Sequence, residues 1–156
     1  MSYASQLVFI GILCCISCSA IGQNENNQWF FGLQAALDYS TNPPIYINGS
    51  EMIAREGCAS ISDTTGQLLF YTNGLTVWNK LHQAMPNGTG LAGGIETSST
   101  HQALICPIPS QEGQYYIFTT DERARSGGLN YSTVDMNLNN GLGGVITKNT
   151  LLFAPA

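Results

Sequence analysis

The sequence has few charged residues. Asp, Glu, Lys and Arg make up 10% of its 156 residues, compared with about 25% in an average soluble domain. The formal net charge is −5, and the five basic residues are Arg55, Lys80, Arg123, Arg125 and Lys148. A nucleic-acid-binding protein needs a concentration of Lys and Arg to neutralise phosphates. This composition therefore disfavours nucleic acid as a partner.

The sequence also lacks the short motifs of common catalytic and metal-binding sites. It contains no P-loop and no G-x-S-x-G nucleophile elbow. His82 and His101 are isolated, with no second ligand at a spacing typical of metal sites. Asp63 stands one residue too far from Gly66 for a sialidase-type Asp-box. We therefore expect no catalytic residue, no metal ligand and no cofactor-binding residue in this chain.

Residues 1–22 have the pattern of a secretory signal peptide. Their apolar core spans residues 7–16, and small residues near the end indicate cleavage after Gly22. Residues 23–156 would then form the mature chain, in which no segment approaches the ~20 apolar residues of a membrane helix. The segment contains no Lys or Arg, so the usual positive start is missing and the true start codon stays open. A lipid anchor on Cys18 and an uncleaved anchor remain as alternatives.

Glycine is abundant, with 17 residues, and turn signals are clearest within residues 56–79. Asp63-Thr64-Thr65-Gly66 offers a side-chain acceptor at its first position and Gly where a positive φ is needed. Asn73-Gly74 is a strong hairpin signal, because both central positions of a type I′ turn need a positive φ. These turns delimit three predicted antiparallel strands, at residues 58–62, 67–72 and 75–79.

Apolar and alternating segments predict further strands. Residues 80–88 are rich in turn-forming residues, and residues 88–100 form a predicted Gly-rich surface loop. The additional strands or extended segments are expected at residues 28–32, 33–40, 45–47, 102–107, 114–121, 129–136 and 145–153.

One of these strands recurs. The segment from Gly66 to Thr72 aligns with that from Gly113 to Thr119, 47 residues further on. Repeats of roughly 40–50 residues with three or four strands are typical of β-propeller blades. The sequence thus predicts an all-β fold of antiparallel, propeller-like blades. A β-sandwich with similar hairpins is the alternative.

The predicted propeller is incomplete. The chain offers about two blades and an N-terminal strand set, whereas a propeller closes with four or more blades. We therefore expect residues 23–156 to be the N-terminal part of a longer domain, truncated at its C-terminus. Such a piece would expose a sheet face that another blade covers.

Two cysteines remain outside the N-terminal segment, Cys58 and Cys106. An exported chain permits a disulfide between them. Because they lie on predicted strands of different repeat units, we favour two buried free thiols that pack as small apolar residues.

Seven segments, spread over nearly all of the mature chain, form a recognisable set: residues 28–32, 56–63, 69–74, 85–88, 115–119, 131–136 and 139–143. Together and in this order they resemble the N-terminal region of large secreted surface proteins of Bacteroidota-type bacteria. This resemblance implies a propeller-like region, often followed by PKD-type modules and a C-terminal sorting domain for type IX secretion or gliding motility. It implies export and cell-surface display, and it supplies no catalytic residue.

Three functions fit these observations. The first is a non-enzymatic interaction module that binds glycan or protein at the bacterial surface. The second is a fragment of a propeller polysaccharide hydrolase or lyase, which needs converging carboxylates. The third is a structural spacer. The candidate carboxylates for the second are Asp63, Asp121, Glu122 and Asp135.

Turn and loop roles explain most of these carboxylates. The densest charge cluster combines Asp121 and Glu122 with Arg123 and Arg125. We interpret it as a solvated loop, with a binding surface as the alternative. Trp78 and the tyrosines offer rings for sugar stacking, although aromatic residues in strands usually pack in the core.

Overall fold

The computed structural model describes residues 24–94, 101–121 and 126–154. The predicted signal peptide, with Cys18, lies outside the described residues, as do Glu122, Arg123 and Arg125. Within the described part, the chain is all-β, with one short 3-10 helix at Asn139–Gly141. This confirms the predicted fold class at the level of antiparallel β-structure. None of the described helical segments is long and apolar enough to cross a membrane.

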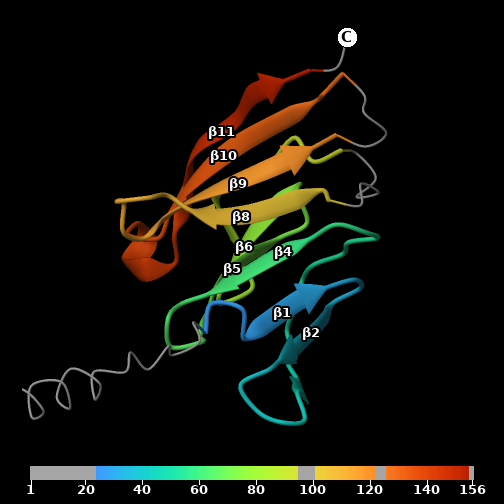
Figure 1. Ribbon diagram of the computed structural model, residues 1–156, viewed down its shortest axis with the longest axis vertical. Coiled ribbons are helices and arrows are strands. Elements are labelled where there is room, and N and C mark those ends of the chain that lie inside the picture. Colours follow the sequence, from blue (N-terminus) through green and yellow to red (C-terminus); the bar gives the residue numbers. More distant parts are fainter. Residues whose placement is uncertain (1–23, 95–100, 122–125, 155–156) are drawn as a thin grey trace, which may run out of the picture.

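The strands form three antiparallel sheets, each in chain order (Figure 1). The first sheet contains β1 (Gln28–Phe31), β2 (Ala35–Asp38) and β3 (Ile45–Tyr46). The second sheet contains β4 (Ala59–Ser62), β5 (Leu68–Thr72), β6 (Thr76–Asn79) and β7 (Ala84–Thr89). The third sheet contains β8 (Ala103–Pro107), β9 (Gln114–Thr120), β10 (Leu129–Asp135) and β11 (Gly144–Phe153).

The second sheet lies between the other two, and each of its faces is covered by an apolar cluster. The cluster toward the first sheet consists of Phe30, Ala36, Met52, Ala54, Leu68 and Tyr71. The cluster toward the third sheet consists of Ile61, Phe70, Val77, Met85, Leu91, Ile117, Val134, Met136 and Val145. Burial of these side chains is the main contribution to the stability of the stack.

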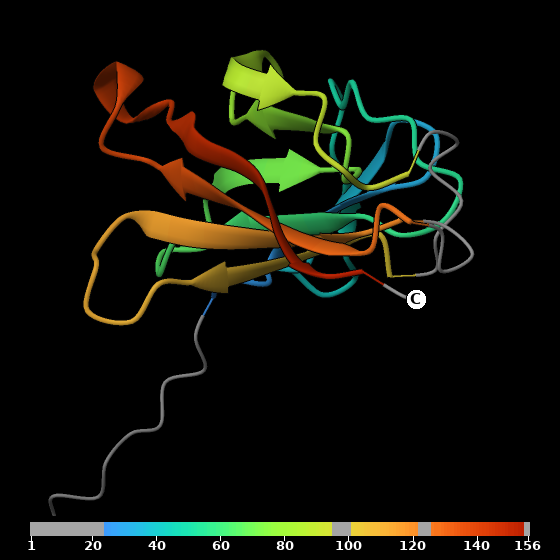
Figure 2. The ribbon, with the colours of Figure 1, turned by 90° about the horizontal axis from the view of Figure 1, so that it is seen from above.

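The second and third sheets stack in the same sense. β4 contacts β8, and β7 contacts β11. β4 and β8 run in the same direction, and the turns that follow them lie on the same side of the molecule (Figure 1). Seen from above, β7 and the start of β11 lie on one side of the stack and β8 on the other (Figure 2). A rotation and a shift therefore superpose the second sheet on the third. Equivalent faces of the two sheets point in the same direction along the stack.

The predicted Asp63–Gly66 turn is confirmed. The Gly66 amide donates to the Asp63 carbonyl at 2.9 Å, and Gly66 has a φ of +89°. The Asp63 carboxylate accepts hydrogen bonds from the Thr65 amide and hydroxyl and from the Gln67 amide. Asp63 therefore acts as a turn residue, as the sequence indicated.

The hairpin at Asn73-Gly74 is confirmed, but its predicted type I′ geometry is wrong. Of the two residues, only Gly74 has a positive φ, at +80°. The Asn73 side-chain oxygen instead accepts hydrogen bonds from the Leu75 and Thr76 amides. The side chain thus closes the turn in place of a second left-handed residue.

The prediction of turns throughout residues 80–88 is wrong, because this segment contains most of β7. Pro86 and Asn87-Gly88 argue against a strand in the sequence, since Pro cannot donate a hydrogen bond to a β-ladder. β7 is the last strand of its sheet. Its register with β6 shifts between the Thr76 and Trp78 pairs. An edge position and an irregular register are the conditions under which a strand tolerates Pro.

The repeated segments fall on β5 and β9, the second strands of the two four-stranded sheets. A bulge in β5 changes how they correspond. Ser62 pairs with Leu68 and Ile61 with Phe70, which leaves Leu69 as an extra residue. Beyond this bulge, Phe70 corresponds to Tyr116 rather than to Ile117, as the pairs Ile61–Phe70 and Cys106–Tyr116 show. The sequence alignment did not include this one-residue shift.

Candidate functional site

The strongest candidate site is an aromatic cleft between β1 and β4. It has a volume of about 500 Å³. We define the aromatic cleft by its eight described lining residues, Asn26, Trp29, Phe30, Phe31, Tyr39, Cys58, Ala59 and Ser60.

The backbone of the cleft is fixed by Ser60 of β4. Its hydroxyl donates to the Gln28 carbonyl at 2.9 Å and accepts the Phe30 amide at 3.3 Å. One side chain therefore satisfies two backbone groups of β1. Without it, these groups would have no partner on the side of β1 that faces β4.

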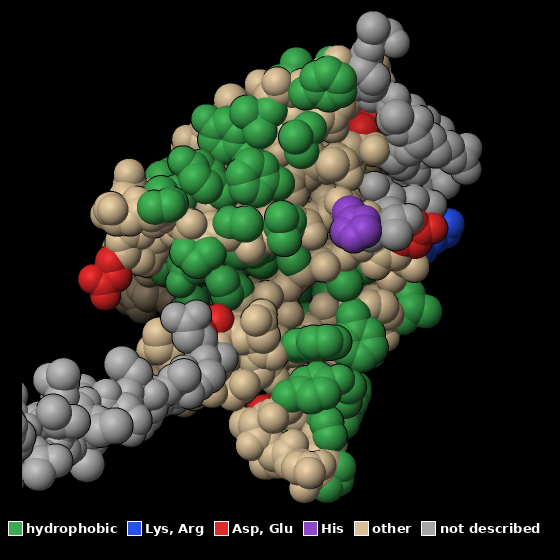
Figure 3. Space-filling view, in the orientation of Figure 1, with side chains coloured by type: hydrophobic (Ala, Val, Ile, Leu, Met, Phe, Trp, Pro, Cys, Tyr) green, Lys and Arg blue, Asp and Glu red, His purple; other side chains and the backbone are tan. Residues whose placement is uncertain are grey.

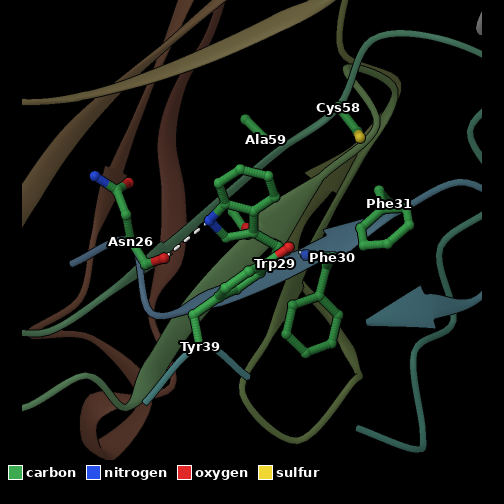
Figure 4. Close-up of a pocket in the computed structure, with 8 residues that line it drawn as sticks. Asn26, Trp29, Phe30, Phe31, Tyr39, Cys58 and Ala59 are labelled. Atoms are coloured by element: carbon green, nitrogen blue, oxygen red, sulfur yellow. Dashed lines mark hydrogen bonds between the residues drawn. The ribbon is translucent and has the colours of Figure 1, made fainter. Parts of the chain in front are cut away.

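The aromatic wall is formed by Trp29 and Tyr39, which are 51% and 43% exposed. Their ring centroids lie 4.9 Å apart at an interplanar angle of 49°. The indole N–H of Trp29 donates to the Asn26 carbonyl at 2.9 Å (Figure 4). The Tyr39 amide donates to the Asn27 carbonyl at 2.7 Å. Both rings are thus oriented before any ligand arrives.

The alternation of β1 explains why Trp29 is available. Successive side chains of a strand point to opposite faces. Phe30 is 2% exposed and joins the core, whereas Trp29 and Phe31 point away from it. The sequence analysis missed this site, and the signal that was present is the Trp-Phe-Phe alternation in β1.

The described lining of the cleft contains no strongly ionisable side chain. None of the eight described lining residues is Asp, Glu, His, Lys or Arg. Burial raises the pKa of the Cys58 thiol above its ordinary value of 9.0, and a hydrogen bond with the Gly32 backbone offsets part of this. The thiol is therefore protonated at neutral pH. A largely apolar, neutral cleft suits binding by contact and hydrogen bonds.

The structure has Cys58 and Cys106 as free thiols, each half-buried. The prediction of two free thiols is therefore confirmed, whereas the prediction that both are buried is wrong. Cys58 lines the aromatic cleft, and Cys106 pairs with Tyr116 in the third sheet. Cys58 precedes β4, and Cys106 lies on the face of β8 that points away from the second sheet, so neither side chain is fully enclosed between the sheets.

The described candidate carboxylates stabilise turns and do not converge. Asp121 follows β9 and accepts the Gly127 amide at 3.1 Å. Asp135 pairs in register with Gln114, at the opposite end of β9, and accepts the Asn137 amide at 2.8 Å. Asp121 and Asp135 therefore lie at opposite ends of the third sheet.

The histidines and Trp78 occupy structural positions. The His82 Nδ1 atom lies 3.2 Å from the Tyr71 hydroxyl, whereas His101 is exposed. Trp78 stacks on Tyr71 at 5.4 Å and packs against the core, so its interpretation as a packing residue is confirmed. Among the described residues, no group of three or more His, Cys, Asp or Glu side chains is placed to hold a metal ion.

A second hollow, of about 360 Å³, lies between the Asp63 turn and the turn before β9. Its lining includes Glu25, Glu112 and Tyr115. Burial, followed by the negative charges of Glu25 and Asp63, raises the pKa of Tyr115. This hollow is acidic, and its Asp63 carboxylate is already engaged in the turn.

Comparison of the chain with protein-family models, with curated proteins and with solved structures found no match.

Proposed function

We propose that this chain is a non-enzymatic interaction module of an exported bacterial surface protein, and that it binds neutral glycans in the aromatic cleft. The observation that carries the proposal is the exposed Trp29–Tyr39 pair, fixed in orientation beside an uncharged floor. Large, rigid aromatic side chains provide contact area at a low cost in conformational entropy.

The chemistry of the cleft favours a sugar over a charged ligand. The C–H face of a pyranose ring is apolar and stacks on an indole or phenol ring, while its hydroxyls need hydrogen-bonding partners. Trp29 supplies the ring face, and Asn26 and Tyr39 carry polar groups at the same site. The neutral lining offers nothing to compensate the charge of an anionic ligand.

The proposal includes a propeller-like arrangement of the sheets as blades. Two four-stranded meanders that stack in the same sense support it, as does the recurrence of one sequence segment in their second strands. The resemblance of residues 28–32, 56–63 and 69–74 to large secreted Bacteroidota-type proteins supports display at the cell surface, with further blades or PKD-type modules in the same polypeptide.

Tryptophan fluorescence tests glycan binding directly. The chain has two tryptophans, so a Trp78→Phe variant leaves Trp29 as the only indole reporter. We expect its emission to change on titration with a neutral oligosaccharide from a panel of cello-, xylo-, manno- and chito-oligosaccharides. The change should be saturable and should not appear with an acidic uronate oligosaccharide.

A binding assay on insoluble polysaccharides separates this function from its alternatives. Trp29→Ala should abolish retention on the glycan selected by titration, while Tyr46→Ala, another exposed aromatic residue of the first sheet, should leave it unchanged. Equal retention of both variants would exclude the aromatic cleft as the site. Release of soluble sugar by the wild-type chain would indicate an enzyme instead.

Export is tested by fusing residues 1–22 to a periplasmic reporter enzyme in a bacterial host. We expect reporter activity outside the cytoplasm and cleavage after Gly22. Loss of a lipid modification in a Cys18→Ser variant would instead identify a lipoprotein, and a reporter retained in the cytoplasm would contradict export.

A further inference from the structure

The third sheet has an apolar outer face that no described part of the chain covers. We define the outer face by the side chains of β8, β9 and β10 that point away from the second sheet. In the register of the sheet these are Leu104, Cys106, Gln114, Tyr116, Phe118, Thr120, Leu129, Tyr131, Thr133 and Asp135. Asp135, at the end of β10, is the one charged residue among them, and so few charges are unusual for the solvent side of a sheet.

Aromatic side chains pack against one another at the centre of the outer face. The ring of Tyr116 lies 5.7 Å from that of Phe118 and 5.5 Å from that of Tyr131, the latter edge-on. Leu104, opposite Phe118, is 58% exposed. At the adjoining end of β11, Phe153 is 63% exposed. Figure 3 shows hydrophobic side chains gathered over the third sheet. Patches of this kind on a soluble protein mark interaction surfaces.

The second sheet shows what covers such a face. Its Phe70 points at the third sheet and meets Tyr115 edge-on at 5.4 Å. After allowance for the extra residue Leu69, the position equivalent to Phe70 in the third sheet is Tyr116, which also lies on the outer face. The two sheets stack in the same sense. The outer face of the third sheet therefore corresponds to the face of the second sheet that packs against the third.

We infer that the outer face is the docking surface for a further antiparallel sheet of the same polypeptide, stacked on the third sheet as the third is stacked on the second. This inference rests on the propeller-like arrangement proposed above and is independent of glycan binding. The occupant presents an aliphatic face, as the third sheet does toward the second with Ile117, Val134 and Val145.

The existing interfaces support this occupant because the outer face is the opposite side of a sheet that already packs on another sheet. Sheet covers sheet twice in the chain, once on each side of the second sheet. A third contact of the same kind extends the stack in the same direction. Apart from Asp135 at one end, the outer face carries no charge, which favours a partner that buries apolar area over one that pairs with charges.

A tandem chain tests the inference. In it, residues 91–153 are repeated directly after Phe153, with the cysteine of the added copy changed to Ser. Linkage gives the added sheet a high effective concentration at the outer face. Cys106 lies on the outer face, so its rate of reaction with a maleimide shows whether that face is covered. Peptide mass spectrometry measures this rate.

We expect labelling of Cys106 to slow by about tenfold or more in the tandem chain. Labelling of Cys58, which lines the aromatic cleft, should stay at the rate of the single chain. A control tandem chain with Leu104→Ser and Phe118→Ser in the first copy should regain fast labelling. An unchanged Cys106 rate in a tandem chain that has gained β-structure by circular dichroism would overturn the inference.

The single chain provides a test that does not depend on folding of the added copy. Leu104→Ser with Phe118→Ser should change the thermal unfolding midpoint little and should reduce binding of a hydrophobic dye. Ile117→Ala, on the covered face of the same strand, should lower the midpoint strongly. If the outer-face variant is as unstable as Ile117→Ala, this chain already covers the face and the inference is wrong.

Self-association of the single chain identifies a different occupant. A discrete dimer in sedimentation that protects Cys106 would assign the outer face to a second copy and contradict a further sheet. Failure of either test leaves the Trp29 titration unaffected, so the two proposals can fail separately.

Discussion

Phe30 of the first sheet stacks on Tyr71 of the second, with ring centroids 4.4 Å apart and an interplanar angle of 15°. Tyr71 is fully buried. Its hydroxyl accepts the Glu51 amide at 3.1 Å. This pair joins the two sheets at the back of the aromatic cleft, because the residue after Trp29 on β1 is the one that enters the core.

Tyr71→Ala should therefore cost about 3–5 kcal/mol of unfolding free energy, the usual range for removal of a buried aromatic ring. Tyr71→Phe keeps the ring and removes the hydroxyl, so it should cost about 1–2 kcal/mol through the unpaired Glu51 amide. Denaturant unfolding measures both. Tyr46→Ala, at a tyrosine that is 61% exposed, should change stability by less than about 0.5 kcal/mol. Equal losses at both tyrosines would contradict the role of Tyr71.

Gly74→Ala should destabilise the chain more than Gly90→Ala. Both glycines have a positive φ, of +80° and +73°, so both substitutions carry a strain of about 1–2 kcal/mol. An added Cβ at Gly74 would lie 2.7 Å from the Cγ of Gln102, whereas one at Gly90 meets no atom within 4 Å. Thermal unfolding of the two variants separates steric crowding from backbone strain. A similar midpoint for both would show that Gln102 moves aside freely.

The Asp63 turn predicts a loss of stability in acid. Partial burial acts to raise the pKa of Asp63, but hydrogen bonds from Thr65, Gln67 and Gly66 outweigh it and lower the pKa below its ordinary value of 3.8. A carboxyl group with a lowered pKa in the folded state stabilises the fold above its ordinary pKa. This contribution disappears as the pH falls through the folded-state pKa.

Asp63→Ala should therefore cost about 1 kcal/mol near neutral pH, and its difference from wild type should vanish on acidification. Urea unfolding at a series of pH values measures this. If the difference between the two proteins stays constant down to the acid limit of folding, the ionised carboxylate is not the group that holds the turn.

Cys58 predicts a pH-dependent labelling rate. Because burial raises its pKa, its thiolate fraction at pH 8 is small, and alkylation should be about tenfold slower than in the unfolded chain. Because the pKa lies above 9.0, the rate should still be rising above that pH, and it should fall when the cleft is saturated with the glycan found by titration. A labelling rate equal in folded and unfolded chains would place Cys58 in open solvent.

Local sequence chemistry was sufficient for most strands and most turns, with β7 as the exception. Asp63 and Gly66 act within their own turn, where side-chain acceptors and a positive φ are properties of a few neighbouring residues. The prediction failed where the partner strand decides the outcome. Pro86 argues against a strand in the sequence, because only the fold shows that β7 is an edge strand, where Pro is accepted. The bulge at Leu69 is likewise visible only from the pairing of β5 with β4.

The sequence by itself determined an antiparallel β-protein with a recurring strand, since turn chemistry and alternation are local. Only the tertiary structure decided which side chains meet. Trp29, Tyr39 and Cys58 come from three segments separated by β2 and β3, and the packing of β1 against β4 brings them to one cleft. The outer face is likewise set by register, because a shift of one residue exchanges the two faces of a strand.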